Sequence, residues 1–526
     1  MSVSGEASAD GPRDRGQQPM LAGQRAKQQN KNRTLRYQGG YFPLGYKAAV
    51  SQWWNSVTPA IAEHAVLSFI PYLQQPPTHT QTGNSPDPPT ASSSTLNLDP
   101  KKAATPVRTN SPVDPYGPRM WTSEMVKLSG KNRAINEFSI ERDGEEVEEN
   151  LVILHGYGAG LGFFYKNFEG LSRVRGWKLY ALDMLGMGRS SRPPFKIRAK
   201  DHQGKISEAE NWFIDSLEEW RAIRKIEKFT LLGHSMGGYM AVAYALKYPG
   251  HLKKIILASP VGIPEDPYAV TADMPSEEPE ESTLGNEFLQ DQEATSISSQ
   301  NNASTYSNAQ NNKADNKSSA PKRPIPKWVS YLWDANISPF SIVRWTGPLG
   351  PRFVSGWSSR RFSHLPENEA QALHEYVYSL FRQSGSGEYA LAYILAPGAF
   401  ARSPLIRRIQ GVGRQVIPSK SSGDEGVRQE SREHGIPVVF MYGENDWMDV
   451  AGGYAAEQKL KEEKEKTLKS ATPEEREMDH GSAKVIIIQK AGHHVYLDGP
   501  DQFNQVVREE MEATGRETKK GNASSV

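Results

Sequence analysis

The stretch that decides the fold reads Gly233-His234-Ser235-Met236-Gly237. It follows an apolar run at 229–232 that predicts a short buried strand, and it precedes residues 238–246, which predict a helix. A G-x-S-x-G sequence between a strand and a helix holds its serine on a very tight turn, with the hydroxyl above the sheet. Glycines beside the serine let the strand and the helix approach closely, because a Cβ atom there would clash. We therefore predict that Ser235 is a nucleophile. The alternative is a glycine-rich turn that happens to contain a serine.

Composition limits the class of protein. The chain has 526 residues, 37% of them hydrophobic, with a formal net charge of +1, and its mean hydropathy is −0.63. Much of the length is therefore expected to lie outside a packed core, and we expect no nucleic-acid partner. The chain contains no cysteine, which excludes disulfides, thiolate catalysis and cysteine-ligated metals. It also contains no run of about 18 apolar residues, so we expect no membrane-spanning helix.

Apolar runs predict strands, and helical patterns fall between most of them. The expected strands lie at 120–128, 135–142, 151–154, 178–182, 229–232, 255–257, 438–442 and 485–488. The first two alternate like an antiparallel pair. Strands that alternate with helices predict an α/β fold, a mostly parallel sheet with helices on both faces.

Composition along the chain predicts how it is divided. In order, we expect a disordered basic tail (1–38), an amphipathic helical segment (39–74), a Pro/Ser/Thr linker (75–113), the N-terminal half of the core (114–264), a disordered insert (265–325), an aromatic-rich helical cap (326–409), a loop (410–435), the C-terminal half of the core (436–512) and a tail (513–526).

Two N-terminal segments each allow two interpretations. Apolar residues recur at helical spacing in 39–74, which predicts a helix or helix pair that either packs against the core or lies on a membrane surface. The segment 23–37 is basic and has no acidic residue, like part of a transit peptide. Glu6, Asp10 and Asp14 lie upstream of it and do not fit that pattern, so a plain basic tail is the alternative.

A serine nucleophile needs a base within hydrogen-bond reach. On an elbow of this kind, the base is a histidine that comes last in the chain order, after the serine and the acid. Gly492-His493-His494 follows the last expected strand. We predict that His493 is the base, and His494 is the alternative.

The base in turn needs a carboxylate that orients it. The turn after the strand at 438–442 contains two, Asp446 and Asp449. We predict Asp446 as the acid and keep Asp449 as the alternative, since either carboxylate could instead cap the following helix.

The negative charge that develops on the substrate oxygen needs two backbone N–H groups. The amide of Met236 is one candidate, because it directly follows the nucleophile. We expect the second from the glycine-rich loop 155–160, with Tyr157 as the donor. The loop 183–190 is also glycine-rich, but it lacks the G-x-x-x-x-G-K-[ST] sequence of a phosphate-binding loop and is interpreted as structural.

Taken together, these motifs resemble a known family. His155-Gly156, the loop 183–190, the Ser235 elbow and Gly492-His493 are similar to the α/β-hydrolase fold family. Three further sets narrow the resemblance, namely ASPVGIP (258–264), GEYAL with PGA (387–391 and 397–399) and HHVYLD (493–498). Their combination resembles fungal cardiolipin-specific deacylases and lysophosphatidic acid acyltransferases, related to animal lipid-droplet lipase coactivators and N-acylphospholipid lipases. The resemblance covers roughly residues 39–75 and 114–512.

The resemblance implies a function. It implies a serine-dependent acyl hydrolase or acyltransferase that deacylates cardiolipin or acylates lysophosphatidic acid. The partners it implies are a phospholipid or lysophospholipid, acyl-CoA as the donor for transfer, and a membrane surface bound peripherally. No cofactor and no metal are expected. In this family His-x4-Asp, here His493 and Asp498, is described as an acyltransferase signature; the alternative is that Asp498 only caps the last helix.

The expected location is the mitochondrion, peripherally on the inner membrane, with the cytoplasm or a lipid droplet as the alternative. Two other functions stay open. One is a non-enzymatic regulator of another lipase on a lipid surface, although Ser235 is present here and the animal coactivators have lost their serine. The other is a soluble carboxylesterase or peptidase with the same three residues.

Overall fold

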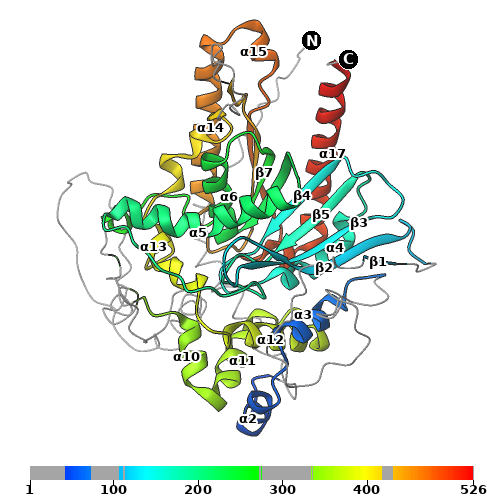
Figure 1. Ribbon diagram of the computed structural model, residues 1–526, viewed down its shortest axis with the longest axis vertical. Coiled ribbons are helices and arrows are strands. Elements are labelled where there is room, and N and C mark those ends of the chain that lie inside the picture. Colours follow the sequence, from blue (N-terminus) through cyan, green and yellow to red (C-terminus); the bar gives the residue numbers. More distant parts are fainter. Residues whose placement is uncertain are drawn as a thin grey trace, which may run out of the picture.

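The computed structural model describes residues 42–72, 106–109, 113–271, 274, 333, 336–417 and 431–524 (Figure 1). Within them, nine strands form one sheet in the order β1-β2-β3-β5-β4-β6-β7-β12-β13. β1, β2, β3 and β5 pair antiparallel, and all pairs from β5 to β13 are parallel. The strands are β1 (Val107–Arg108), β2 (Arg119–Lys127), β3 (Ala134–Arg142), β4 (Glu149–Leu154), β5 (Trp177–Leu182), β6 (Phe229–His234), β7 (Leu252–Ala258), β12 (Pro437–Gly443) and β13 (Ser482–Ile488).

The central strands are apolar because helices cover both faces of the sheet. Every residue of β6 and of β12 is buried, as expected for parallel strands covered on both sides. α5 (His202–Ile223) and α6 (Met236–Lys247) pack together on one face, and α4 (Tyr165–Leu171) and α17 (Pro500–Ser524) on the other (Figure 1). The predicted mostly parallel sheet with helices on both faces is confirmed.

Four further helical elements belong to the core, and each follows one of the parallel strands. η2 (Leu161–Phe164) follows β4, and α16 (Val495–Asp498) follows β13. α14 (Val450–Ser470) and α15 (Pro473–Glu477) connect β12 to β13 and project from the end of the molecule away from the cap (Figure 1).

The cap is inserted between β7 and β12. Its helices are α10 (Pro339–Trp345), η3 (Gly347–Leu349), α11 (Gly350–Arg361), α12 (Glu367–Phe381), η4 (Gly387–Ala390) and α13 (Leu391–Ile394). Shorter elements accompany them, namely α7 (Pro267–Thr271), β8 (Leu395–Ala396), β9 (Phe400–Ala401), η5 (Leu405–Arg407), η6 (Ile409–Gly411), β10 (Val416–Ile417) and β11 (Ser431–Arg432). Of the cap aromatics, Trp333, Phe340, Trp357 and Phe362 are buried and form the interior of the cap.

Two short helices precede the core and both lie on the cap (Figure 1). α3 (Pro59–Leu67) buries Ala62, Val66 and Leu67 against α12 and η2. α2 (Tyr46–Trp54) contacts η3 and α11 but leaves Trp54 78% exposed. The segment 39–74 therefore packs against the rest of the protein through α3, while α2 keeps an apolar side in solvent.

The helices do not all end at the expected segment boundaries. α17 continues to Ser524, across the boundary placed at 512, and the segment 410–435 contains the β10–β11 pair. The tail 1–38 and most of 75–113 and 265–325 lie outside the described residues. Among the helices that are described, none combines the length and apolarity that crossing a bilayer requires.

Candidate active site

Ser235 occupies the turn between β6 and α6 in a conformation that side chains rarely adopt. Its φ is 51° and its ψ is −114°, and residues other than glycine are strained at such angles. The turn is held from both sides, since the Ser235 N–H donates to the Ala258 carbonyl at 2.9 Å and the Tyr239 N–H donates to the Ser235 carbonyl at 3.1 Å. The surrounding backbone thus compensates for strain at the one residue predicted to react.

The glycines of the elbow are required by close backbone approach. A Cβ atom at Gly233 would lie 2.3 Å from the Gly237 carbonyl oxygen, and one at Gly237 would lie 2.7 Å from the carbonyl oxygens of His155 and Leu154. Both distances are far below van der Waals contact, so no other residue fits without moving the backbone. The expectation that these glycines permit close packing of strand and helix agrees with this geometry.

His493 and Asp446 lie together at the carboxyl ends of β13 and β12. His493 Nδ1 is 3.1 Å from Asp446 Oδ1, and both side chains are almost fully buried. Asp446 Oδ1 also accepts the Met448 N–H at 3.0 Å, which holds the carboxylate in place. The ring of His234, next to Ser235, lies 4.8 Å from the His493 ring between centroids. This arrangement brings the predicted base and acid to the same edge of the sheet as the elbow.

The two alternative residues have other surroundings. Asp449 is exposed at the start of α14, where its Oδ1 accepts the Ala451 N–H at 2.9 Å and caps the helix. His494 is half-buried and stacks on Phe163, with ring centroids 5.9 Å apart. Burial, and then the nearby Arg361, lower the pKa of His494 well below its usual range. Only His493 of the two histidines has a carboxylate recorded at its ring nitrogen in the described part of the chain.

The loop after β4 lies against the elbow, as expected of an oxyanion-binding loop. A Cβ atom at Gly156 would lie 3.1 Å from Ser235 Cβ. Met236 begins α6, so its amide precedes the first hydrogen bonds of the helix. Tyr157 stacks on Phe340 of α10 with ring centroids 5.1 Å apart, which places the cap directly over this loop.

Sequence reasoning missed how the loop is supported. Asp183, fully buried after β5, accepts the Leu161 N–H at 2.7 Å, the Asn136 amide at 2.8 Å and the Arg189 N–H at 2.7 Å. Its carboxylate therefore holds the start of η2, next to the candidate oxyanion loop, to β3 and to its own loop. The structural role expected of 183–190 agrees with these contacts. The signal available in the sequence was an aspartate directly after a buried strand.

Glu63 joins the N-terminal segment to the same cluster. It lies fully buried on α3, and its carboxylate bonds to Arg189 at 2.5 Å, Asn136 at 3.0 Å and the Tyr376 hydroxyl at 3.3 Å. Burial outweighs these partners and raises the pKa of Glu63 to about 7. No sequence pattern distinguished this glutamate from the polar side of an amphipathic helix.

Asp498, the second residue of the His-x4-Asp sequence, ends α16. Its Oδ2 accepts the Gly492 N–H at 3.0 Å, and its Oδ1 lies 3.3 Å from Arg361 of the cap. The structure therefore places Asp498 beside the backbone that leads into His493. The carboxylate that contacts the imidazole nitrogen Nδ1 of His493 is that of Asp446.

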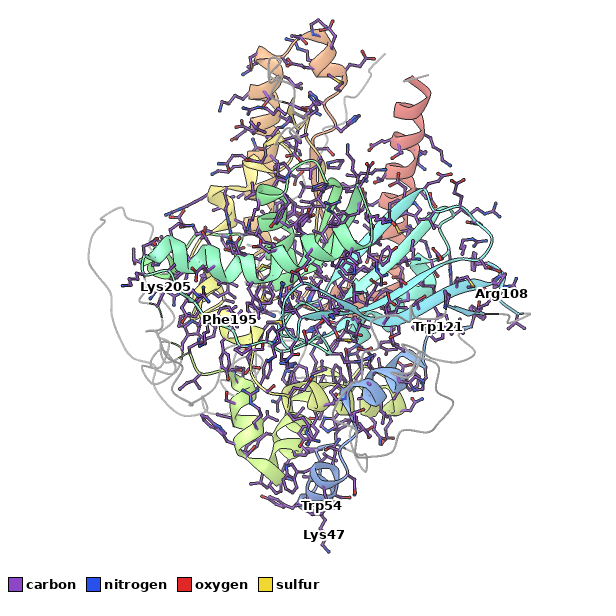
Figure 2. The ribbon with its side chains drawn as sticks, in the orientation of Figure 1. Lys47, Trp54, Arg108, Trp121, Phe195 and Lys205 are labelled. Atoms are coloured by element: carbon purple, nitrogen blue, oxygen red, sulfur yellow. The ribbon has the colours of Figure 1, made fainter. Side chains whose placement is uncertain are left out.

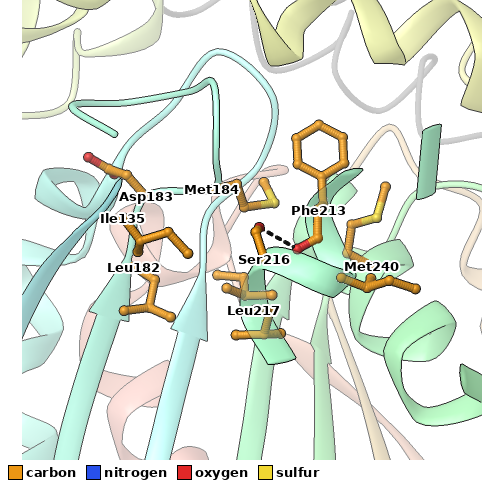
Figure 3. A pocket seen from close by; sticks show the side chains of 10 residues that line it. Ile135, Leu182, Asp183, Met184, Phe213, Ser216, Leu217 and Met240 are labelled. Atoms are coloured by element: carbon orange, nitrogen blue, oxygen red, sulfur yellow. Dashed lines mark hydrogen bonds between the residues drawn. The ribbon is translucent and has the colours of Figure 1, made fainter. Parts of the chain in front are cut away.

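A small cavity lies under the site (Figure 3). Its lining includes Leu154, Asp183, Met184, Phe213 and Met240, and its volume is about 10 Å³. A space of this size holds at most about one water molecule. It is a packing gap between the sheet and α5, and it is too small to take an acyl chain.

Comparisons with known proteins agree with this architecture. Residues 149–500 match the family described as alpha/beta hydrolase fold. A 1-acylglycerol-3-phosphate O-acyltransferase from Arabidopsis thaliana is 33% identical over 390 residues, which cover 72% of this chain and 70% of the relative. A protein from Mus musculus that is named for the same activity is 30% identical, and the match covers 74% of this chain and 85% of the relative. A (lyso)-N-acylphosphatidylethanolamine lipase from Mus musculus is 30% identical, and the match covers 68% of this chain and 78% of the relative.

Proposed function

Because the chain belongs to the α/β-hydrolase fold family, we propose that it is a serine-dependent acyl hydrolase or acyltransferase acting on glycerophospholipids. One observation carries the proposal. His493 Nδ1 lies 3.1 Å from Asp446 Oδ1 at the sheet edge where the strained turn presents Ser235. A base oriented by a buried acid beside such a turn is the arrangement that acyl transfer through a serine ester requires.

The proposed reaction proceeds through an ester on Ser235. His493 takes the hydroxyl proton while Ser235 Oγ bonds the acyl carbonyl carbon, and Asp446 stabilises the charged imidazole. The amides of Met236 and Tyr157 are proposed to bind the oxyanion. Collapse breaks the ester C–O bond, or the thioester C–S bond when acyl-CoA is the donor, and His493 returns the proton to the leaving oxygen or sulfur. Water or a lysolipid hydroxyl then attacks the acyl-enzyme by the same steps in reverse and frees Ser235.

The substrate class follows from the relatives. Two of them are named for acylation of 1-acylglycerol-3-phosphate and one for cleavage of N-acylphosphatidylethanolamine, so all three names concern acyl chains on phospholipids. We propose two specific reactions for this chain, deacylation of cardiolipin and acylation of lysophosphatidic acid with acyl-CoA as donor.

An exposed apolar surface supports peripheral membrane binding. The docking face consists of six side chains on α2, α10, η3 and α11, each at least 40% exposed, namely Tyr46, Val50, Trp54, Trp345, Leu349 and Phe353. Trp54 and its neighbour Lys47 project from the tip of the molecule (Figure 2). Aromatic side chains gathered on one exposed face are typical of proteins that bind a lipid surface.

The charge of this region suits anionic lipids. Residues 42–57 and 339–361 contain no Asp or Glu, while Lys47, Arg352 and Arg360 lie within them. The Arg352 guanidinium lies 4.3 Å from the centre of the Tyr46 ring, so a basic and an aromatic group lie side by side on this face. Each basic group near an anionic membrane contributes about 1 kcal/mol to binding. We propose that this face rests on the bilayer and directs the cap toward its lipid substrate.

The decisive experiment is replacement of the nucleophile. Purified protein is expected to release fatty acid from cardiolipin vesicles or to acylate lysophosphatidic acid, and to be labelled by a serine-directed fluorophosphonate. Ser235→Ala is expected to abolish labelling and to lower turnover by three orders of magnitude or more. Ser259→Ala, at a buried serine after β7, is the matched control and is expected to stay labelled.

Other outcomes would assign another function. Full activity of Ser235→Ala protein in restoring the lipids of a deletion strain would indicate a non-enzymatic lipid-surface regulator. Turnover of short water-soluble esters with none of phospholipids would indicate a soluble esterase. Fractionation of cells tests the proposed location on the mitochondrial inner membrane against the cytoplasm and lipid droplets.

A further inference from the structure

The Asp498 carboxylate contacts two different parts of the protein, one through each of its oxygens. Its Oδ2 accepts the Gly492 N–H at 3.0 Å. Its Oδ1 lies 3.3 Å from both terminal nitrogens of Arg361 and 3.4 Å from His364 Nε2. Three N–H donors therefore hold the carboxylate by hydrogen bonds, one on Oδ2 and two on Oδ1, and His364 lies beside Oδ1. The carboxylate is thus held from two sides, through Oδ2 by the chain that leads into His493 and through Oδ1 by the cap.

The contact on one side reaches the base. Gly492 directly precedes His493, and its N–H is the group that Asp498 holds. The carbonyl before it, that of Ala491, accepts the Asn445 N–H at 2.9 Å, next to Asp446. The backbone entering His493 is therefore fixed on one side by the turn that carries Asp446 and on the other by Asp498.

The contact on the other side reaches the cap. Arg361 is the last residue of α11, and its side chain is 14% exposed where it meets Asp498. The earlier part of the same helix holds the segment before α2, because Ser355 Oγ accepts the Leu44 N–H at 3.1 Å and Arg352 donates to the Leu44 carbonyl at 2.6 Å. α11 thus spans from the chain that leads into the docking face to the loop of the predicted base.

We infer that Asp498 is a positioning residue that ties the His493 loop to helix α11 of the cap, and that it serves hydrolysis and acyl transfer alike. The inference rests on the proposed function, since it assigns to His493 the role of base in both reactions. The His-x4-Asp sequence then describes a base and the residue that positions it. The carboxylate acts through the Gly492 amide and the Arg361 guanidinium and does not touch the substrate.

The inference predicts that both reactions fail together. Asp498→Asn keeps the shape of the side chain but places a neutral amide against Arg361. We expect kcat for ester hydrolysis and kcat for transfer to lysophosphatidic acid to fall by the same factor, on the order of 10- to 100-fold, because a small misplacement of a catalytic group has costs of that size. KM is expected to change little. Arg361→Gln, which keeps the Gly492 contact, is expected to lower both reactions in parallel by a smaller factor.

A second measurement does not depend on turnover. Hydrogen exchange of the peptide that contains Gly492 is expected to speed up in Asp498→Asn and in Arg361→Gln protein. Arg407→Gln is the matched control, since it removes an exposed pair with Glu265 on the cap side, and it is expected to leave this peptide and both reactions unchanged. If the wild-type protein catalyses neither reaction but hydrogen exchange at Gly492 is faster in the two variants, the proposed function is contradicted. The structural link from the His493 loop to α11 through Asp498 is then still supported.

Two results would overturn the inference. One is loss of transfer in Asp498→Asn with hydrolysis and exchange unchanged, which would make Asp498 a group acting on the acceptor. The other is unchanged rates and unchanged exchange in both variants. Should Asp498→Asn fail to fold, Arg361→Gln still decides the question by the same two readouts.

Discussion

Ser235 shows how much of the candidate active site is decided within a few residues. Its φ of 51° follows from the need to turn a buried strand into a helix within one residue, and the flanking glycines make the turn possible. The acid is a different case. Asp446 and Asp449 lie in the same turn, three residues apart, and the local sequence pattern does not show which of them orients His493. Asp446 points back to His493, and Asp449 points forward to the first turn of α14.

The two carboxylates can be separated by matched substitutions. Asp446→Ala is expected to lower kcat by about 10⁴-fold with little change in KM, because His493 loses the group that orients it. Asp449→Ala is expected to keep its activity and to lose about 1 kcal/mol of stability with the helix cap. Steady-state kinetics and urea unfolding measure the two effects. The reverse pattern, a dead Asp449→Ala and an active Asp446→Ala, would make Asp449 the acid.

At the scale of elements, α3 is part of the framework of the candidate active site. Glu63 on this helix bonds to Arg189, Asn136 and Tyr376, and Asn136 in turn bonds to Asp183, which holds η2. One buried cluster therefore links the N-terminal segment, the cap and the core beside the loop that carries Tyr157. The sequence predicts an amphipathic segment here that packs on the core or lies on a membrane surface, and in the structure Glu63 joins α3 to the candidate site.

The cluster predicts a pH dependence of stability. The pKa of Glu63 is raised from 4.5 to about 7 in the folded protein, chiefly by burial. Between these values the folded protein keeps a proton that the unfolded chain has lost, so stability falls as pH rises from about 4.5 to about 7. The difference amounts to about 3 kcal/mol. Glu63→Gln removes this contribution, and the variant is expected to lose less stability than wild type between pH 5 and pH 8 in urea unfolding.

The comparison must use the difference between the two proteins. Glu137 also has a pKa raised to about 7 by burial, and it adds its own pH dependence to both. Subtracting the two unfolding curves isolates Glu63. Parallel curves at all pH values would show that Glu63 keeps an ordinary pKa beside Arg189.

At the scale of the whole molecule, the docking face and the charged helices lie at opposite ends. α2, α10 and α11 form one end, and α14 and α15 form the other (Figure 1). The cap lies between the proposed membrane surface and the carboxyl ends of the strands. A lipid entering from the docking face therefore meets the cap before it reaches Ser235.

Vesicle binding tests the orientation. Trp54→Ser combined with Phe353→Ser removes two exposed rings of the docking face and is expected to weaken binding to phosphatidylserine-containing vesicles by at least about tenfold, since each buried ring contributes about 1.5–3 kcal/mol. Tyr454→Ser is the matched control, because Tyr454 is 52% exposed on α14. Co-sedimentation measures binding, and added salt is expected to weaken it. Equal loss with Tyr454→Ser, or none with the double variant, would contradict the proposed face.

Most of the sheet was predictable, and the contacts between distant elements were not. The strands at 151–154, 229–232 and 438–442 are apolar because both faces are covered, and that pattern is local. The elbow at Ser235 is equally local. Three of these contacts join residues far apart in the sequence. His493 lies 47 positions from Asp446, Arg361 lies 137 positions from Asp498, and Arg189 lies 126 positions from Glu63. No spacing rule reaches over such separations.

The sequence by itself determined the parallel sheet and the position of the predicted nucleophile Ser235, because buried strands and a one-residue turn restrict which side chains fit. Only the tertiary structure decided which carboxylate orients His493, that Asp498 binds Arg361 of the cap, and that a glutamate of α3 reaches the core. Each of these is a choice among polar side chains of equal local propensity. It is made by burial, because a buried charge must find partners in whichever elements the fold brings beside it.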